Sequence, residues 1–305
     1  MNTRLRAMIG KRFIKASLQS LLYAPLLFAT GVASAMPFYF STGDADGAVA
    51  MASRPGGNDV FEIEAADDFV LNQDITLTNA TFTGLLVDGA TINHIKSVDV
   101  EIYRVFPYAS DTTRTPSSPT RVNSPSDVAL TSRGSNLSEL TYSASQITST
   151  FAATNSVLPG GVHSSPNQTT LGSGPIVGEE VLFKVDFTTP LNLLADHYFF
   201  VPQVEFDTGE FLWLSAAKPI VLPGTPFLPD LQAWTRDESL DPDWLRVGGD
   251  ILSSNGSRSI NAAFTLSGDT ATSVPEPGSL VLMGLGLLAL VASTRRVPKI
   301  LRMQS

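Results

Sequence analysis

Apolar and polar residues alternate along much of the chain between residues 36 and 273. Residues 181–187 read Val-Leu-Phe-Lys-Val-Asp-Phe, and residues 260–266 carry Ile, Ala, Phe and Leu at every second position. A period of two places these apolar side chains on one face of a strand, so both segments are predicted to be half-buried antiparallel strands. Further strands, rich in β-branched or aromatic residues, are predicted at residues 60–71, 75–87, 98–106, 198–206 and 210–215.

No long segment keeps the 3.6-residue period of an amphipathic helix. Residues 146–157 are a candidate for a short helix, although they are rich in Thr and Ser. Gly, Asn, Asp and Pro separate the strands, and a body of about 240 residues suits one all-β domain. We therefore expect residues 36–270 to form an all-β domain, an antiparallel two-sheet sandwich of the jelly-roll type.

Two long loops are predicted within this domain. Residues 108–127 are rich in Ser, Thr, Pro and Arg and contain too little apolar surface to order themselves. Their arginines, Arg114 and Arg121, are expected to hold this exposed loop against an acidic body. Residues 159–178 are rich in Gly, Ser and Pro and form the second loop.

The N-terminal 35 residues have the organisation of a secretory signal peptide. Five basic residues between positions 4 and 15 precede an apolar segment at residues 18–32, and Ala33-Ser34-Ala35 provides a small-residue cleavage site. Export through the secretion translocon is expected, with a mature chain that starts at Met36. An uncleaved anchor is the alternative reading.

The C-terminal segment, residues 271–305, is predicted to be a linker, a proline-containing motif, a transmembrane helix and a basic tail. The motif is Val274-Pro275-Glu276-Pro277, and the 18 residues 277–294 carry no charge. As a helix they would cover about 27 Å, close to the thickness of a hydrocarbon core. The basic residues that follow place that end in the cytoplasm by the positive-inside rule. They are Arg295, Arg296, Lys299 and Arg302.

This C-terminal segment resembles the PEP-CTERM sorting signal. The resemblance implies that Pro275, Glu276 and Pro277 are recognised by the membrane enzyme exosortase. It also implies that the helix and the pair Arg295 and Arg296 hold the protein in the inner membrane until it is processed. A plain C-terminal membrane anchor is the alternative.

The body itself is similar to the uncharacterised extracellular β-sandwich domains that often precede this signal. The similarity lies in the opening segment Phe40–Gly47, the strand segment Ala66–Leu71 and the loop Leu240–Arg246. This second resemblance implies no known activity.

The net charge of the body limits the classes of partner that it is expected to bind. It holds all but one of the chain's 29 acidic residues, while the two ends hold nine of the 20 basic residues, so the formal net charge of the body is −17. Such a surface argues against binding to nucleic acids or to anionic membranes, because basic residues supply most of that affinity. The chain has no cysteine, so the exported protein uses no disulfides.

Asp44, Asp46 and Gly47 form the one candidate metal site, for calcium. Ca²⁺ takes oxygen ligands from closely spaced carboxylates and carbonyls. The spacing of an EF-hand is not met, because Ala48 and Pro55 stand at its fifth and twelfth positions. A turn with solvated carboxylates is therefore the favoured alternative, and no other cofactor is expected.

Trp234 and Trp244 are candidate carbohydrate-binding residues. They flank an acidic loop, and indole faces beside hydrogen-bond acceptors are the materials of a sugar-binding cleft. The favoured alternative is that both cover a sheet edge, while Trp213 belongs to a strand in the core.

Catalytic signatures are absent from the sequence, since it contains no G-x-S-x-G, H-E-x-x-H or Walker motif and its three histidines are scattered. We do not expect an enzyme and assign no catalytic residue. The sequence predicts an exported structural or adhesive protein of the cell surface or of an exopolysaccharide, biofilm-type matrix, with extracellular polysaccharide as a candidate partner. The alternatives are a polysaccharide-acting enzyme and a calcium-dependent carbohydrate-binding module.

Overall fold

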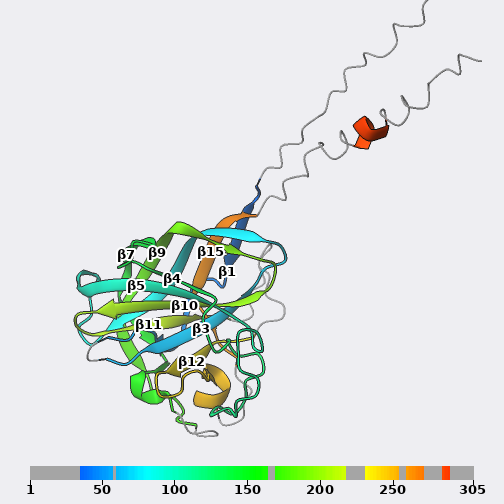
Figure 1. The fold of residues 1–305 in the computed structure, drawn as a ribbon. Coiled ribbons are helices and arrows are strands. Elements are labelled where there is room, and N and C mark those ends of the chain that lie inside the picture. Colours follow the sequence, from blue (N-terminus) through cyan, green and yellow to red (C-terminus); the bar gives the residue numbers. More distant parts are fainter. Residues whose placement is uncertain are drawn as a thin grey trace, which may run out of the picture. The chain divides into compact units, whose positions relative to one another are not determined.

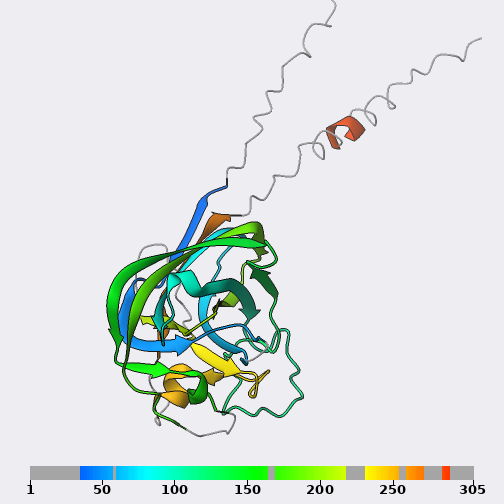
Figure 2. The same ribbon diagram turned by 90° about the vertical axis from the view of Figure 1, so that its left-hand side faces the viewer.

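The structure is a computed structural model that describes residues 35–57, 60–163, 169–217, 231–253, 259–270 and 284–288. Two β-sheets make up the body, as Figures 1 and 2 show. This confirms the expected all-β, two-sheet class. The strand order of the sheets does not establish a jelly roll, so that part of the expectation stays a prediction.

The larger sheet is built around β4. This 13-residue strand pairs with β9 along one side and with β15 and then β11 along the other. Strand β7 continues the sheet beyond β9, and in Figure 2 these two long green strands curve along the outside of the body. Its described strands are β1 (Pro37–Ser41), β2 (Ala45–Ala52), β4 (Ile75–Val87), β7 (Leu140–Ala153), β8 (Asn155–Val157), β9 (Ile176–Leu193), β11 (Glu210–Ala216), β14 (Asn261–Ala262) and β15 (Phe264–Thr270).

The smaller sheet has the strand order β13-β12-β3-β10-β5-β6 in the described part of the chain, and all its pairings are antiparallel. Its strands are β3 (Ile63–Val70), β5 (Ile95–Arg104), β6 (Thr131–Gly134), β10 (His197–Phe206), β12 (Trp234–Asp237) and β13 (Leu245–Arg246). The helical turns among the described residues of the body are η1 (Ile92–His94), η2 (Pro159–Gly161) and the single-turn π-helix η3 (Val247–Ile251).

Aromatic side chains fill the space between the sheets. Phe200 of β10 stacks on Phe264 of β15 with ring centroids 5.2 Å apart, and Trp213 of β11 meets Phe264 at 5.7 Å. All three are fully buried. Because large buried aromatics contribute most of the apolar area, these contacts anchor one sheet to the other. Trp213 is thus a core residue, as its strand pattern suggested.

The predicted strands are present, but the short helix predicted at residues 146–157 is wrong. That segment forms the second half of β7 and all of β8. Two irregularities in the pairing of β7 with β9, at Gln146/Thr148 and Thr148/Phe151, interrupt the alternation of inward and outward side chains. An extra residue at such a bulge hides the period of two that marks a strand in the sequence.

Between β5 and β6 the chain contains no strand, and the segment is packed more closely than its composition suggested. Arg121 is only 8% exposed, and Ser118, Ser124 and Ser126 are buried. The segment buries little apolar surface, and ion pairs of Arg114 and Arg121 hold it in place instead. After η2, the segment predicted as the second loop ends at Ile176, where β9 begins.

The two predicted targeting segments lie almost wholly outside the described residues. The predicted signal peptide meets them only at Ala35, and the predicted transmembrane helix only at residues 284–288, which are helical. Across the described ranges, no helix combines the length and the apolar character needed to cross a membrane.

Candidate functional site

Arg236 is the centre of a buried charged cluster on the smaller sheet. The register of β12 and β3 sets Arg236 directly opposite Glu64, so the two opposite charges face each other across the strands. The guanidinium Nε donates to Glu64 Oε2, and Nη2 donates to the Tyr103 hydroxyl at 2.8 Å. Arg236 and Glu64 are 6% and 2% exposed, so each needs the other to compensate its lost hydration.

Glu64 shares the Tyr103 hydroxyl with a second carboxylate. The hydroxyl oxygen lies 2.7 Å from Glu64 Oε1 and 2.7 Å from Glu101 Oε2. The phenol carries one proton, so its hydroxyl can donate fully to only one of the two carboxylates at a time. Burial raises the pKa of Glu64 to about 7, although Arg236 acts to lower it and Glu101 adds to the rise.

Trp244 packs within the same cluster. The Arg236 guanidinium carbon lies 4.4 Å from the centre of the Trp244 ring, and Tyr103 meets the indole edge-on at 5.3 Å. The indole nitrogen donates to the carbonyl of Ser126 at 3.2 Å. With 1% of its surface exposed, Trp244 is a core residue that joins the sheet to the loop before β6.

Charge also fastens the loop between β5 and β6. Arg114 donates to Asp243 Oδ1 at 2.7 Å and to Asp127 at 3.3 Å, and Arg121 forms an ion pair with Asp127. Burial acts to raise the pKa of Asp243, but hydrogen bonds from Arg114 and from the Ser117 amide outweigh it, so the pKa is lowered. The expectation that Arg114 and Arg121 hold this loop against acidic groups is confirmed.

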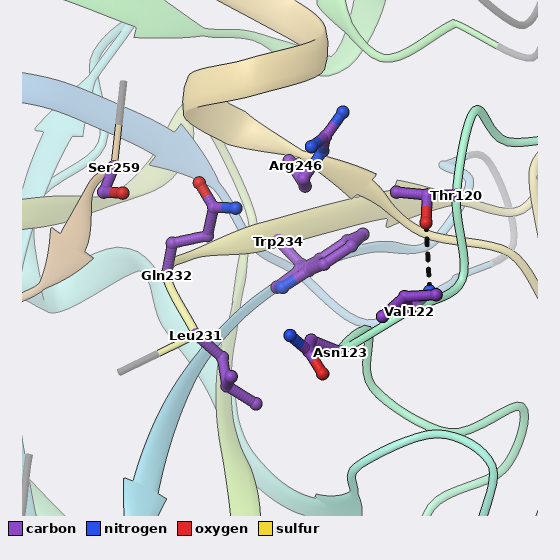
Figure 3. Close-up of a pocket in the computed structure, with 8 residues that line it drawn as sticks. All are labelled: Thr120, Val122, Asn123, Leu231, Gln232, Trp234, Arg246 and Ser259. Atoms are coloured by element: carbon purple, nitrogen blue, oxygen red, sulfur yellow. Dashed lines mark hydrogen bonds between the residues drawn. The ribbon is translucent and has the colours of Figure 1, made fainter. Parts of the chain in front are cut away.

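A pocket of about 300 Å³ opens between this loop and the end of β12 (Figure 3). The Trp234 side chain lies across it, with its nitrogen edge turned toward the space between Leu231, Gln232 and Asn123. Arg246 stands on the other side and is held by Asp250, whose Oδ1 lies 2.6 Å from Nη2. The lining residues are Thr120, Val122, Asn123, Leu231, Gln232, Trp234, Arg246 and Ser259.

Trp234 has a donor with no acceptor. Its side chain is 1% exposed, and its Nε1 is buried without a hydrogen-bond partner in the described part of the chain. A buried unsatisfied N–H costs free energy that an acceptor from a bound molecule would recover. The pocket therefore suits a small polar molecule that presents a hydroxyl or carbonyl oxygen to the indole.

The structure does not bring Trp234 and Trp244 together on an exposed face. Trp234 lines the pocket, whereas Trp244 lies beneath Arg236 in the core. A flat platform for sugar rings formed by both indoles is not present in the described residues. Carbohydrate binding stays a prediction. Of the two candidate residues, Trp234 lines a pocket that could hold a sugar.

Asp44 and Asp46 are both exposed. Asp46 Oδ1 accepts hydrogen bonds from the Ala48 amide at 2.9 Å and from the Ser215 hydroxyl at 2.5 Å. Gly47 supplies the positive φ of 68° in this turn. No group of three or more acidic or histidine side chains suited to a metal occurs among the described residues. Calcium binding at Asp44 and Asp46 stays a prediction.

Arg236 and Arg246 were not identified from the sequence. Arg236 stands two residues after Trp234 in the run Trp-Thr-Arg-Asp, and an arginine buried in such a strand is almost always paired. Its partner Glu64 lies 172 positions away in the sequence. Only the pairing of β12 with β3 reveals which carboxylate it meets.

Comparisons with known proteins inform the C-terminal segment alone. No curated protein and no solved structure matches the chain. A family model described as the PEP-CTERM protein-sorting motif matches residues 273–296. This range contains Val274, the predicted recognition element Pro275-Glu276-Pro277 and the pair Arg295 and Arg296. The chain therefore carries a PEP-CTERM protein-sorting motif, which implies exosortase-dependent sorting to the cell surface or exterior.

Proposed function

We propose that this protein is a structural or adhesive component of the cell surface or of an exopolysaccharide matrix. The observation that carries the proposal is the sorting motif at residues 273–296. The acidic body, which is disulfide-free, supports it, because a high net charge keeps an exported domain soluble. In this role the C-terminal segment anchors the precursor only until it is processed, and the body is the functional domain.

The proposed route has three steps. The N-terminal signal directs the chain into the secretion translocon, and the apolar C-terminal helix anchors the precursor in the inner membrane. Exosortase then acts at the proline motif and releases the body to the surface. The two proposed processing sites are the signal-peptide cleavage site after Ala35 and the proline motif around Pro275.

The two ends of the body are suited to this processing. The Met36 amide donates to Thr270 Oγ1 at 3.0 Å, and the Thr270 amide donates to the Met36 carbonyl at 2.8 Å. Strand β1 thus joins the last strand, β15, from the first residue of the expected mature chain. Processing at either end leaves this ladder intact.

Strand β7 supports a role in assembly. It is 14 residues long, lies at the edge of the larger sheet, and pairs only with β9 in the described part of the chain. Its sequence, Leu-Thr-Tyr-Ser-Ala-Ser-Gln-Ile-Thr-Ser-Thr-Phe-Ala-Ala, contains no charge and no proline. Charged residues and proline are the usual protection of an edge against pairing with another strand. The β7 edge therefore suits pairing with a second copy of this body. Separately, we propose that the two sheets form a jelly-roll-like sandwich.

Carbohydrate binding is the second candidate function, and the buried, unpaired Nε1 of Trp234 favours it. The pocket is at the small end of the range for ligand sites, which suits one sugar unit. Calcium at Asp44 and Asp46 is part of this second candidate, although neither residue lines the pocket. Sugar binding at Trp234 and calcium binding at Asp44 and Asp46 are both parts of our proposal. We also propose that the body acts without catalysing a reaction.

A glycan-binding and hydrolysis screen of the purified protein, with calcium and with chelator, tests these functions. The structural role predicts no turnover of any polymer, so hydrolysis would overturn it. Sugar binding that Trp234→Phe weakens would support the pocket, since this change keeps an aromatic ring but removes the N–H donor. Thr208→Ala, a change at an exposed position outside this pocket, is the control.

A further inference from the structure

A second pocket, of about 450 Å³, lies at one end of the body between the two sheets. The smaller sheet contributes Arg104 from β5, Arg133 from β6 and Tyr198 from β10. The larger sheet contributes the C-terminal end of β9. The lining residues are Arg104, Leu130, Thr131, Arg133, Thr189, Pro190, Leu191, Asn192, Leu193, Leu194 and Tyr198. All of them lie within the described ranges.

The strand register places the two arginines on one face. Arg133 of β6 lies opposite Val100 of β5. Arg104 lies four residues after Val100 on β5. Alternate residues of a strand share a face, so Arg104 points to the same side as the buried Val100. It lies where the core ends and the pocket begins. Arg104 is also directly opposite Tyr198 on β10.

Neither arginine pairs with a carboxylate among the residues that the structure describes, in a body with a net charge of −17. Arg104 Nε is buried without a hydrogen-bond partner there, and its guanidinium lies 5.7 Å from the ring centre of Tyr108. Arg133 uses Nε to bind the Thr189 carbonyl at 3.2 Å and Nη1 to bind Thr131 and Ser132. Its Nη2 is left as a donor.

Two carboxylates stand nearby but are engaged with backbone amides. Asp196 accepts from the His197 amide at 2.9 Å, and Asp74 accepts from the Ala195 amide at 2.8 Å. Burial and then the charge of Asp196 raise the pKa of Tyr198, whereas the charge of Arg104 and a hydrogen bond from its side chain act to lower this pKa. Neither carboxylate lies within 4.0 Å of Arg104 or Arg133.

The rest of the lining is amphipathic. Leu191 and Leu193 are buried and form apolar surface, while Thr189, Pro190 and Asn192 are exposed at the rim. A sugar ring has the same character, since its C–H faces are apolar and its edge carries hydroxyl groups. The volume accommodates one sugar unit of a chain that continues into solvent.

We propose that this pocket binds a carboxylate-bearing sugar of an acidic polysaccharide, with Arg104 and Arg133 as the carboxylate-binding residues. The planar fork of a guanidinium matches the two oxygens of a carboxylate. An isolated carboxylate on a sugar ring also suits an acidic body better than a densely charged polyanion, because the surrounding negative charge repels the latter. The inference goes beyond the structural role proposed above and concerns a different surface from the pocket at Trp234.

Calorimetric titration of the full-length protein in mild detergent with a sugar trimer that carries one glucuronate unit tests this inference. The trimer should bind, and the same trimer with its carboxyl group reduced should bind at least about tenfold more weakly, because a hydrogen bond to a charged group is lost. Equal affinity for the two trimers, or no binding of the acidic trimer, would overturn the proposal. So would competition by inorganic sulfate at the same concentration as the trimer, because it would indicate a site for any anion.

Arg133→Gln is the informative variant, because Arg133 lies at a half-exposed edge position where the fold tolerates change. It should weaken binding of the acidic trimer by about tenfold to a hundredfold while leaving the melting temperature nearly unchanged. The matched control is Lys184→Gln, which removes one positive charge from an exposed position on β9. This control should change the affinity by less than about twofold. If Arg133→Gln binds as tightly as Lys184→Gln, the assignment is wrong.

Discussion

Arg236 shows how a single residue of this body combines structural tasks. It neutralises Glu64, donates to Tyr103 and lies against the face of Trp244. A guanidinium can do all three, since its edge donates hydrogen bonds while its face packs on aromatic rings. The cluster thereby ties β12, β3 and β5 together within the smaller sheet.

Arg236→Met should destabilise the body by about 3 to 5 kcal/mol at pH 8, because Glu64 becomes a buried charge without a partner. The loss should shrink toward pH 5. Without Arg236 the pKa of Glu64 rises further above its ordinary value of 4.5, so the folded state takes up the proton first and acidification offsets the lost partner. Urea unfolding at the two pH values measures this. Adding Glu64→Gln should recover part of the loss at pH 8, and an equal loss at both pH values would contradict the account.

Asp99 provides a second test at the residue scale. Burial, together with Glu101 and Glu205, raises its pKa from 3.8 to about 6 in the folded protein. The neutral form is favoured on folding, so the contribution of Asp99 to stability is present below about pH 4 and is lost as the pH rises through 6. Asp99→Asn should therefore raise the melting temperature at pH 7 but not at pH 4. Asp269→Asn, at an exposed position of β15, is the control, and equal effects of the two changes would refute the assignment.

At the scale of elements, local patterns were sufficient for the strands but not for their partners. The alternation in residues 181–187 identified β9, and residues 75–87 matched β4 at both ends. Bulges concealed the outer half of β7 because they break the period of two. The candidate sites depend on pairings between distant strands, such as Arg236 with Glu64, which no local pattern encodes. Burial of Trp244 beneath Arg236 has the same origin.

The edge of β7 carries a prediction about assembly. If this edge pairs with a second copy, Ser145→Lys should abolish self-association in sedimentation experiments, because an exposed lysine on an edge strand opposes pairing. Thr188→Lys introduces the same charge at an exposed position of β9, which already has neighbours on both sides, and should associate like the unmodified protein. Association that survives Ser145→Lys, or a protein that is monomeric throughout, would exclude this edge.

At the scale of the whole molecule, the sorting motif and the body are separate parts of the chain. The sorting motif occupies residues 273–296, and the body, Ser34–Thr272, forms a unit of its own. Its first and last strands, β1 and β15, pair with each other. The destination follows from the motif, whereas the functions that we propose for the body rest on its pockets and its β7 edge.

The most direct test of this account replaces Pro275, Glu276 and Pro277 with alanine and measures how the protein divides between inner membrane and cell surface. Loss of the recognition element should leave the protein in the inner membrane as an unprocessed precursor. Pro298→Ala, a proline change outside the matched residues, should be sorted normally. Surface delivery of the triple variant at the unmodified level would contradict sorting through this motif.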